Sequence, residues 1–226
     1  GCSSLILVKI PESVTKIEDN AFDGCSSLID IEIPGSLKYI GNYAFNNCNK
    51  LNQLSIDLYQ TKYSENSFNE CSSLHHLILL TPTNTINKNS FENHFINIGH
   101  ITKITIPNMI TEIKENSFKN CSTLKEIILP PTLNRIESNS FSKCSSLTQI
   151  KIPSSVTEIG SNSFSECSSL EQIEIPSSIT KLKESLFQQC SSLTQIEIPN
   201  SVTEIESYSF SECSSLEQIK IPSSVI

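Results

Sequence analysis

Apolar side chains recur along this chain at a fixed interval of 23 residues. Counted from the cysteine that begins each unit, leucine stands at +3, aliphatic residues at +6 and +8, proline at +9, valine or a relative at +12, and isoleucine at +15. Phenylalanine occupies +20 in every unit: Phe22, Phe45, Phe68, Phe91, Phe118, Phe141, Phe164, Phe187 and Phe210. A fixed period of this length is the signature of a stacked-repeat protein.

Each unit predicts three local elements. In residues 170–175, LEQIEI, the alternation of Ile173, Glu174 and Ile175 predicts a half-buried strand. Proline at +9 ends that strand because it has no backbone donor, and the following SSVTEI segment predicts a second short strand or extended run. The piece before the next cysteine is too short for a stable helix and predicts a tight turn. Its asparagine column suits a left-handed backbone position: Asn20, Asn66, Asn89, Asn116, Asn139 and Asn162.

These elements predict a repeat solenoid. No single unit can bury its apolar columns, whereas stacked copies place leucine on leucine and phenylalanine on phenylalanine. We expect a parallel β-sheet on the concave face, short strands and tight or 3-10 turns on the other side, and few or no long helices. Residues 1–226 form a single solenoid in this prediction, with nine repeats, the fifth expanded from 23 to 27 residues, and a partial tenth. The pattern indicates a fragment of a longer array.

The consensus CSSL..I.IP.SVT.I....F resembles the BspA-like (Treponema-type) class of leucine-rich repeat, and the resemblance covers essentially the whole chain. It implies a leucine-rich-repeat right-handed coil. It also implies a non-enzymatic binding module, commonly on the surface of bacteria or parasitic protists and linked to adhesion to host matrix proteins. The family defines no residue-level site, so none carries over. The glycine often found after the +15 isoleucine survives here only as Gly41 and Gly160.

Nine cysteines occupy one column, and their interpretation decides whether redox or metal chemistry is expected. Neighbouring cysteines would stand one strand spacing apart, within the range of a disulfide. However, their number is odd, and a single column gives each thiol two equivalent neighbours. Zinc sites use closely spaced pairs such as C-x-x-C, which the chain lacks. We interpret the column as small buried core residues: Cys2, Cys25, Cys48, Cys71, Cys121, Cys144, Cys167, Cys190 and Cys213.

The remaining residues show no catalytic or cofactor pattern. His75 and His76 are adjacent, and His94 and His100 lie in the irregular repeat, but no third ligand is spaced to join them in a metal site. We expect no enzyme, no metal and no cofactor, because the chain has no placed Cys–His pair and no glycine-rich phosphate loop. The net charge of −8 argues against nucleic acid as a partner. The longest apolar runs are too short for a transmembrane segment.

The places where the period breaks are the candidates for function. Repeats three and four lose the +9 proline and the +12 aliphatic residue. The fifth repeat carries four extra residues in the stretch 92–100, between Phe91 and Ile101. Insertions in a solenoid form loops, and such loops often serve binding. Drift without selection would produce the same irregularity.

Strand positions +5 and +7 are expected to point outward from the concave sheet. The +7 column is polar except at Ile78 and Ile128, which flank Thr105. An apolar patch edged by ionisable groups is typical of a partner site, so we predict a protein or peptide site at six residues: His76, Ile78, Lys103, Thr105, Glu126 and Ile128. A column of glutamines could serve recognition, but stacked amides bonding along the ladder are the simpler interpretation: Gln149, Gln172, Gln195 and Gln218.

The functional prediction is a non-enzymatic protein–protein interaction module, an adhesin-type binder acting through the concave face near repeats four to six. Two alternatives stay open. The array could be an intracellular scaffold or regulatory subunit that docks onto a signalling enzyme such as a phosphatase. It could instead be a structural spacer that self-associates as a homodimer through uncapped solenoid ends. The sequence leaves localisation open. The resemblance implies the cell surface or exterior, and the cytoplasm is the alternative.

Overall fold

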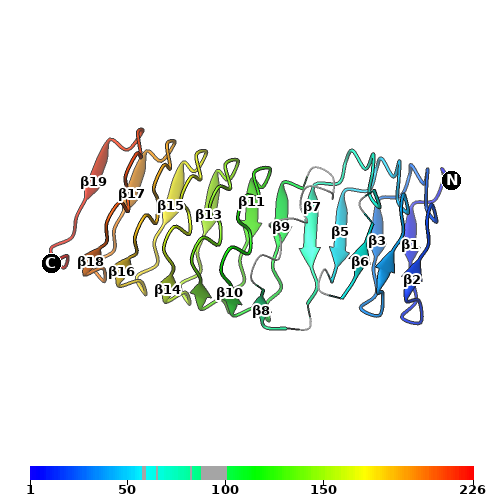
Figure 1. The fold of residues 1–226 in the computed structure, drawn as a ribbon, viewed down its shortest axis with the longest axis horizontal. Helices are drawn as coiled ribbons and strands as arrows, with labels where there is room; N and C mark the ends of the chain where they lie inside the picture. Colours follow the sequence, from blue (N-terminus) through cyan, green and yellow to red (C-terminus); the bar gives the residue numbers. More distant parts are fainter. Residues whose placement is uncertain (58–59, 65, 82, 88–100) are drawn as a thin grey trace. The chain divides into compact units, whose positions relative to one another are not determined.

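The computed structural model describes residues 1–57, 60–64, 66–81, 83–87 and 101–226, and every structural statement below concerns these residues. Each described repeat contributes a first strand at its +5 to +8 segment and, in most repeats, a two-residue second strand near +14 (Figure 1). No helix occurs in this part of the chain. The first strands are β1 (Leu7–Lys9), β3 (Asp30–Glu32), β5 (Gln53–Ile56), β7 (His76–Leu79), β9 (Lys103–Thr105), β11 (Glu126–Ile128), β13 (Gln149–Lys151), β15 (Gln172–Glu174), β17 (Gln195–Glu197) and β19 (Gln218–Lys220). The second strands are β2 (Lys16–Ile17), β4 (Tyr39–Ile40), β6 (Lys62–Tyr63), β8 (Thr85–Ile86), β10 (Glu112–Ile113), β12 (Arg135–Ile136), β14 (Glu158–Ile159), β16 (Lys181–Leu182) and β18 (Glu204–Ile205).

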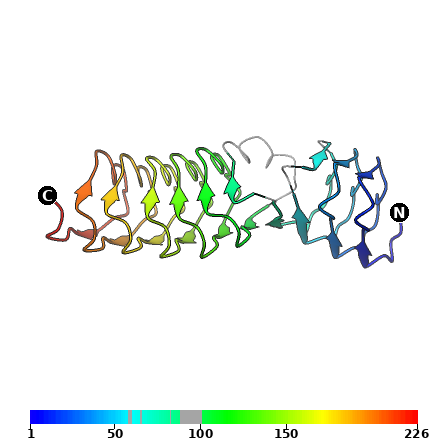
Figure 2. The same cartoon turned by 90° about the horizontal axis from the view of Figure 1, so that it is seen from below.

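The described chain divides into two compact units. The first contains residues 1–81 and 101–107, and the second contains residues 83–87 and 108–226. In the first unit, the first strands pair in the order β1-β3-β5-β7-β9 and the second strands in the order β2-β4-β6. In the second unit, the sheets include β13-β15-β17-β19, β8-β10-β12-β14 and β16-β18. Within each unit the two kinds of strand lie in separate rows (Figure 2).

All of these pairings are parallel, and equivalent positions of successive repeats stand opposite each other. Ile173 pairs with Ile196, for example, and Ile136 pairs with Ile159. The predicted parallel-strand repeat solenoid and the predicted second short strand are therefore confirmed. The prediction that residues 1–226 form a single domain stays a prediction.

The core consists of the columns that the sequence pattern identified. Leu170, Ile173 and Phe164 are at most 7% exposed, as are their equivalents in neighbouring repeats. The phenylalanine rings stack nearly parallel, with centroids 5.2 Å apart between Phe22 and Phe45 and 5.3 Å apart between Phe118 and Phe141. This separation at near-zero interplanar angle is the offset stacking that aromatic rings prefer. Each ring therefore depends on its neighbours above and below for burial.

The turn before each cysteine contains two left-handed backbone positions rather than the single predicted one. The predicted asparagine position has positive φ at Asn20, Asn116, Asn139 and Asn162, while Asn89 lies outside the described residues. The second position immediately precedes the cysteine, and its residue types are varied: Gly24, Asn47, Glu70, Asn120, Lys143, Glu166, Gln189 and Glu212. Sequence reasoning missed this column because glutamate, lysine and glutamine have no preference for positive φ.

Hydrogen bonds between turns explain why these unfavourable residues accept a left-handed conformation. The backbone amides of Asn116, Phe118 and Asn120 donate to carbonyls of the next repeat at 3.1, 2.8 and 2.9 Å. The same alternation recurs in the following turns. An unpaired buried amide would cost about 1–3 kcal/mol, the same order as the strain of one left-handed residue, so the hydrogen bonds between repeats offset that strain.

Serines complete the polar side of the core. The buried Ser163 hydroxyl donates to the carbonyls of Gly160 at 2.7 Å and Glu137 at 3.0 Å. The hydroxyl of Ser155, which follows the +9 proline, donates to the carbonyl of Leu133 in the preceding repeat at 2.7 Å. The serine-rich composition is therefore largely structural, because these hydroxyls satisfy buried carbonyls.

Gly160 stands where the backbones of two repeats approach closely. A Cβ at Gly160 would lie 2.4 Å from the backbone nitrogen of Ser138, and one at Gly41 would lie 2.5 Å from the nitrogen of Asp19. By contrast, nothing lies within 4 Å of the equivalent point on Gly35. The surviving glycines of the +16 column therefore have a steric reason.

We expect Gly160→Ala to lower the free energy of unfolding by about 1–3 kcal/mol, because the added methyl must push two repeats apart. Gly35→Ala is the matched control and is expected to change it by less than about 0.5 kcal/mol. Urea unfolding followed by circular dichroism measures both. Equal stability of the two variants would contradict the close approach.

Candidate interaction surfaces

Four of the six predicted site residues lie together on the first unit. His76 and Lys103 are partners in the register of β7 with β9, and Ile78 is the partner of Thr105. The Nε2 atom of His76 lies 2.9 Å from the Thr105 hydroxyl. Ile78 also stands opposite Ser55 of β5. Its side chain is therefore a partly exposed apolar group between two hydroxyl-bearing neighbours.

The other two predicted residues, Glu126 and Ile128, lie on β11 in the second unit. Ile128 is 42% exposed, which makes it one of the more exposed large apolar side chains of the described chain. On the same unit β11 packs beside β13, whose outward residues are Gln149 and Lys151. The prediction that all six residues form one patch stays a prediction.

The histidine and insertion predictions are only partly covered by the described residues. The inserted stretch 92–100, with His94 and His100, lies outside them. The Nδ1 atom of His75 lies 2.8 Å from the carbonyl oxygen of Ser73, so His75 and His76 have different partners. Within the ranges that the structure describes, no group of three or more His, Cys, Asp or Glu side chains is placed to hold a metal ion.

The second unit carries a regular polar face on β13, β15, β17 and β19. The outward residues of these strands are exposed and stand in register, with Gln172 between Gln149 and Gln195 and with Glu174 next to Glu197. The glutamine amides make no side-chain hydrogen bond to one another in this described sheet. The expected ladder of bonded amides is therefore wrong. Exposed amides remain hydrated, which removes the reason for them to pair.

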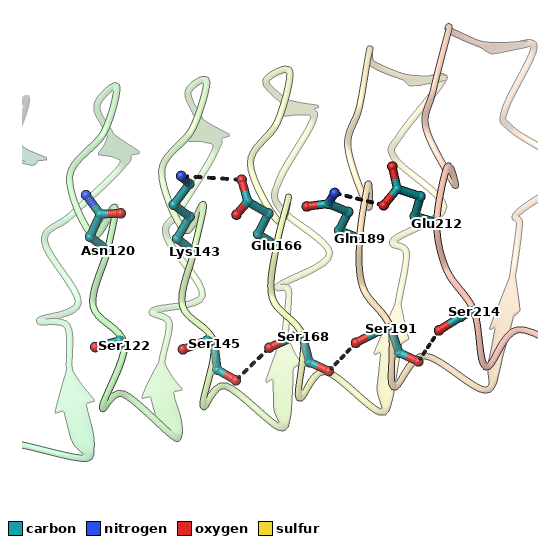
Figure 3. Close-up of a pocket in the computed structure, with 10 residues that line it drawn as sticks. All are labelled: Asn120, Ser122, Lys143, Ser145, Glu166, Ser168, Gln189, Ser191, Glu212 and Ser214. Atoms are coloured by element: carbon teal, nitrogen blue, oxygen red, sulfur yellow. Dashed lines mark hydrogen bonds and ion pairs between the residues drawn. The ribbon is translucent and has the colours of Figure 1, made fainter.

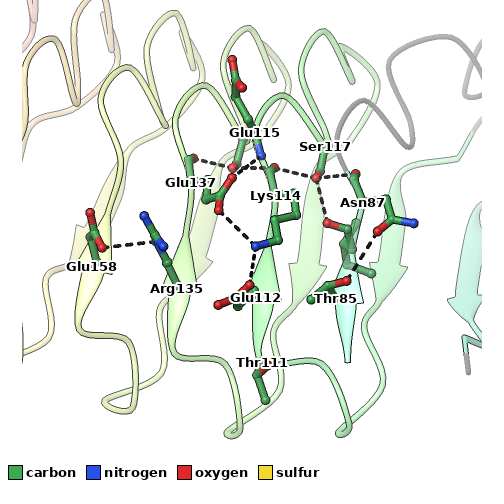
Figure 4. Close-up of polar contacts among 12 residues, drawn as sticks. Thr85, Asn87, Thr111, Glu112, Lys114, Glu115, Ser117, Arg135, Glu137 and Glu158 are labelled. Carbon is green, nitrogen blue, oxygen red and sulfur yellow. Dashed lines mark hydrogen bonds and ion pairs between the residues drawn. The ribbon is translucent and has the colours of Figure 1, made fainter. Parts of the chain in front are cut away.

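The opposite side of the second unit has a different electrostatic arrangement (Figure 4). The Lys114 ammonium contacts Glu112 and lies 3.2 Å from the carboxylate of Glu137. Arg135 lies 3.2 Å from Glu158. These ion pairs join neighbouring second strands and turns, and the hydrogen bonds that Lys114 donates to Glu112 and Glu137 raise the pKa of Lys114. Because the side chains are partly exposed, each pair adds little stability.

The same column continues with Lys181 and Glu204, whose charged atoms are 2.6 Å apart. Their hydrogen bond raises the pKa of Lys181 and lowers the pKa of Glu204. Opposite charges alternate from strand to strand along this column, so most of its charge is neutralised within the protein. We therefore regard this side as a structural face rather than a binding surface.

An open groove of about 870 Å³ runs along the turns of the second unit (Figure 3). Sequence reasoning missed it, because half of its lining comes from the unpredicted left-handed column and half from the first serine after each cysteine. Ten residues line it: Asn120, Ser122, Lys143, Ser145, Glu166, Ser168, Gln189, Ser191, Glu212 and Ser214.

The polar groups of this groove are mostly engaged within the protein. Lys143 lies 3.5 Å from the Glu166 carboxylate, and the Gln189 amide donates to Glu212 at 2.9 Å. The hydroxyl of Ser191 donates to the carbonyl of Ser168 at 3.3 Å, and this contact is repeated in adjacent turns. The groove offers weak hydrogen-bonding groups and lacks an apolar anchor, so it is a poorer candidate than the sheet faces.

Seven of the nine cysteines are buried core residues, whereas Cys2 is exposed and Cys213 is partly buried. All nine are free, and Cys144, Cys167 and Cys190 are fully buried. Each of these three thiols donates to the carbonyl of a phenylalanine 26 residues earlier, at 3.1–3.2 Å. Burial raises the pKa of all three, because a thiolate would be desolvated. In the first unit, the interaction between the neighbouring thiols of Cys48 and Cys71 raises the pKa of Cys48 and lowers that of Cys71. The burial and raised pKa of Cys144, Cys167 and Cys190 disfavour the thiolate that nucleophilic chemistry needs.

Comparison with known proteins agrees with the repeat geometry. The model of a family described as BspA type leucine rich repeat region, with six copies, matches residues 1–125 and 92–216, which together are most of the chain. No curated protein matches the chain. No segment in the described ranges is a helix long and apolar enough to cross a membrane.

Three crystal structures are similar to the chain. A leucine-rich repeat protein from Bacteroides ovatus is 24% identical, with a TM-score of 0.51 over 100% of this chain and 69% of that one. The T. pallidum leucine rich repeat protein is 24% identical, with a TM-score of 0.48 over 94% of this chain and 78% of that one. A leucine rich cell surface protein from Faecalibacterium prausnitzii is 29% identical, with a TM-score of 0.46 over 98% and 74% of the two chains. The first of these likenesses supports the fold.

The buried thiols predict a loss of stability at alkaline pH. Unfolded cysteine ionises above about pH 8.5, whereas the folded pKa of Cys167 is raised, so the folded state binds more protons in that range. Stability is therefore fully present below the unfolded pKa and falls as the pH rises above it, by about 1.4 kcal/mol per pH unit for each such thiol. We expect Cys167→Ala to reduce this slope, measured by urea unfolding between about pH 8 and pH 10.

Ser163→Ala provides the matched control. It also removes a buried hydrogen-bond donor from the same turn, but the lost hydroxyl does not titrate in this pH range. It is expected to lower stability by a similar amount at each pH. An unchanged slope in Cys167→Ala would contradict the assignment of the thiols as buried neutral groups.

Proposed function

Because the chain belongs to the BspA-type leucine-rich repeat family, we propose that it is a non-enzymatic protein–protein interaction module that binds a partner through the outward face of its first strands. The family is typically an interaction fold, and its repeats present side chains in regular rows. The proposal therefore assigns binding to outward residues and leaves the buried columns a structural role.

One observation carries the proposal. On the first unit, Ile78 is an apolar residue in an otherwise polar row, with His76 and Lys103 beside it and the hydroxyl of Thr105 opposite it. A partly exposed apolar centre with a polar rim is the arrangement of a protein-binding surface. The second unit has an isoleucine at the same strand position, Ile128, next to Glu126. Both surfaces fit a protein or peptide partner.

We extend the proposal to adhesion, with a host or matrix protein as the partner. Family membership supports this extension, since adhesion is a plausible use of such repeats. An open face of short strands with exposed isoleucine also suits a protein surface better than a small molecule, which is usually enclosed in a deeper pocket.

Binding of purified chain to immobilised fibronectin, fibrinogen and laminin tests the proposal by biolayer interferometry. We expect at least one of them to bind, and Ile78→Asp to weaken that binding by roughly tenfold, because burial of a charge in an apolar contact is costly. Ile128→Asp tests the second unit in the same way.

Tyr43→Asp is the matched control. Tyr43 is 37% exposed on a turn of the first unit and has positive φ, which aspartate tolerates. It is expected to bind like the unmodified chain. If the unmodified chain bound none of the three proteins, the adhesion proposal would fail. If both aspartate variants bound normally while retaining their circular dichroism spectra, the proposed surfaces would be wrong.

A further inference from the structure

The second unit presents four charges in one straight column on its first strands. Lys151, Glu174, Glu197 and Lys220 occupy equivalent positions of β13, β15, β17 and β19, and the parallel register places each beside the next. All four are exposed. Read across the strands, the column is positive, negative, negative and positive.

This column breaks a rule that the opposite side of the same unit obeys. Like charges directly opposite each other on neighbouring strands are destabilising, yet Glu174 and Glu197 are register partners. On the second strands, Arg135 pairs with Glu158 and Lys181 pairs with Glu204. No ion pair joins the four column residues to any other group in the described chain. Proteins place residues against such local preferences, here like charges on neighbouring strands, mainly at functional positions.

A second row of polar groups runs beside the charges. The amides of Gln149, Gln172, Gln195 and Gln218 are exposed at the other outward position of the same strands and make no hydrogen bonds to one another. Each amide can both donate and accept. The described face therefore combines charges that stand in a defined order and form no ion pairs with hydrogen-bonding groups that can contact polar side chains of a partner.

The spacing of the column discriminates between partner shapes. Neighbouring strands are about 4.8 Å apart, so the four charges span about 14 Å. An α-helix rises about 1.5 Å per residue, so residues i, i+3, i+7 and i+10 of one helical face span about 15 Å. In an extended strand, side chains on the same face repeat about every 6.6–6.8 Å. This spacing exceeds the distance between neighbouring charges of the column by about 2 Å, so the mismatch grows with each charge. A helix lying across the strands matches the column.

We propose that the β13–β19 face binds an α-helical segment of a partner protein that carries an acidic, basic, basic, acidic stripe at positions i, i+3, i+7 and i+10. The two basic residues of the helix lie against Glu174 and Glu197 and relieve their repulsion, while its acidic residues meet Lys151 and Lys220. This inference rests on the proposed function, since it names the partner class for one of the two units.

Two synthetic helical peptides of the same composition test it. The matching peptide carries Glu, Lys, Lys and Glu at i, i+3, i+7 and i+10, and the reversed peptide carries Lys, Glu, Glu and Lys there. We expect the matching peptide to bind the unmodified chain at least tenfold more tightly by fluorescence anisotropy. Binding is expected to weaken by roughly tenfold as the salt rises from about 0.05 M to about 0.5 M, because exposed charges are screened.

Charge reversal on the protein supplies the decisive comparison. The double variant Glu174→Lys/Glu197→Lys is expected to lose the matching peptide by at least tenfold. The control Glu184→Lys/Glu212→Lys changes the net charge equally, but its residues lie on turns of the same unit, and it is expected to bind like the unmodified chain. If both double variants still bound both peptides, the inference would be overturned. It would also be overturned if the unmodified chain bound the two peptides with equal affinity.

The remaining outcomes separate this inference from the proposed function. If a matrix protein binds through Ile78 or Ile128 but neither peptide binds, the helix inference is wrong and the interaction module stands. If concentration-dependent sedimentation shows a dimer that Glu174→Lys/Glu197→Lys abolishes, a second copy covers the face and the inference is overturned. If the matching peptide alone binds and no matrix protein does, the inference holds and the adhesion part of the proposed function fails.

Discussion

Backbone hydrogen bonding between successive repeats is the constraint on which the rest of the structure depends. A repeat contains strands of only two to four residues and a turn, and none of these can satisfy its amides or bury its side chains alone. Many amides of the strands and of the turn instead bond to carbonyls of the neighbouring repeat, as Phe141 does to Ser163 at 2.9 Å. Because the same bonds recur from one repeat to the next, a 23-residue period keeps strands, turns and side-chain columns in register together.

This constraint divides the residues into two kinds. Inward columns must stack on copies of themselves, so they tolerate only residues that pack in a row, such as the parallel rings of Phe118 and Phe141. The buried thiol of Cys167 follows the same logic, since it donates to the Phe141 carbonyl of the preceding repeat and burial raises its pKa. Outward positions carry no such requirement. Variation at Ile78, Ile128 and Glu174 is therefore free to serve a partner without disturbing the core.

The two outward sides of the second unit use charge in different ways. On the second strands, alternating signs form ion pairs such as that of Arg135 with Glu158, and these support the correct register. On the described first strands, Glu174 and Glu197 are register partners, and neither forms an ion pair with the lysine on its other side, Lys151 or Lys220. The charges of the second strands are paired within the protein. The charges of Glu174 and Glu197 form no ion pairs in the described chain and can therefore pair with a partner. This difference is the physical basis for assigning binding to the first-strand face.

The sequence alone determined the repeat period, the buried columns, the parallel solenoid and the position of the first left-handed residue, because each is a local preference repeated until it is unmistakable. It also identified Ile78 and Ile128 as exceptions in an outward column. Only the tertiary structure decided the second left-handed column, since at Lys143 or Glu166 contacts with the next repeat override residue preference. It likewise showed that the glutamine amides do not bond to each other. The tertiary structure also decided which charges form ion pairs. Pairing depends on the distances between side chains of different repeats, and the sequence pattern does not contain these distances.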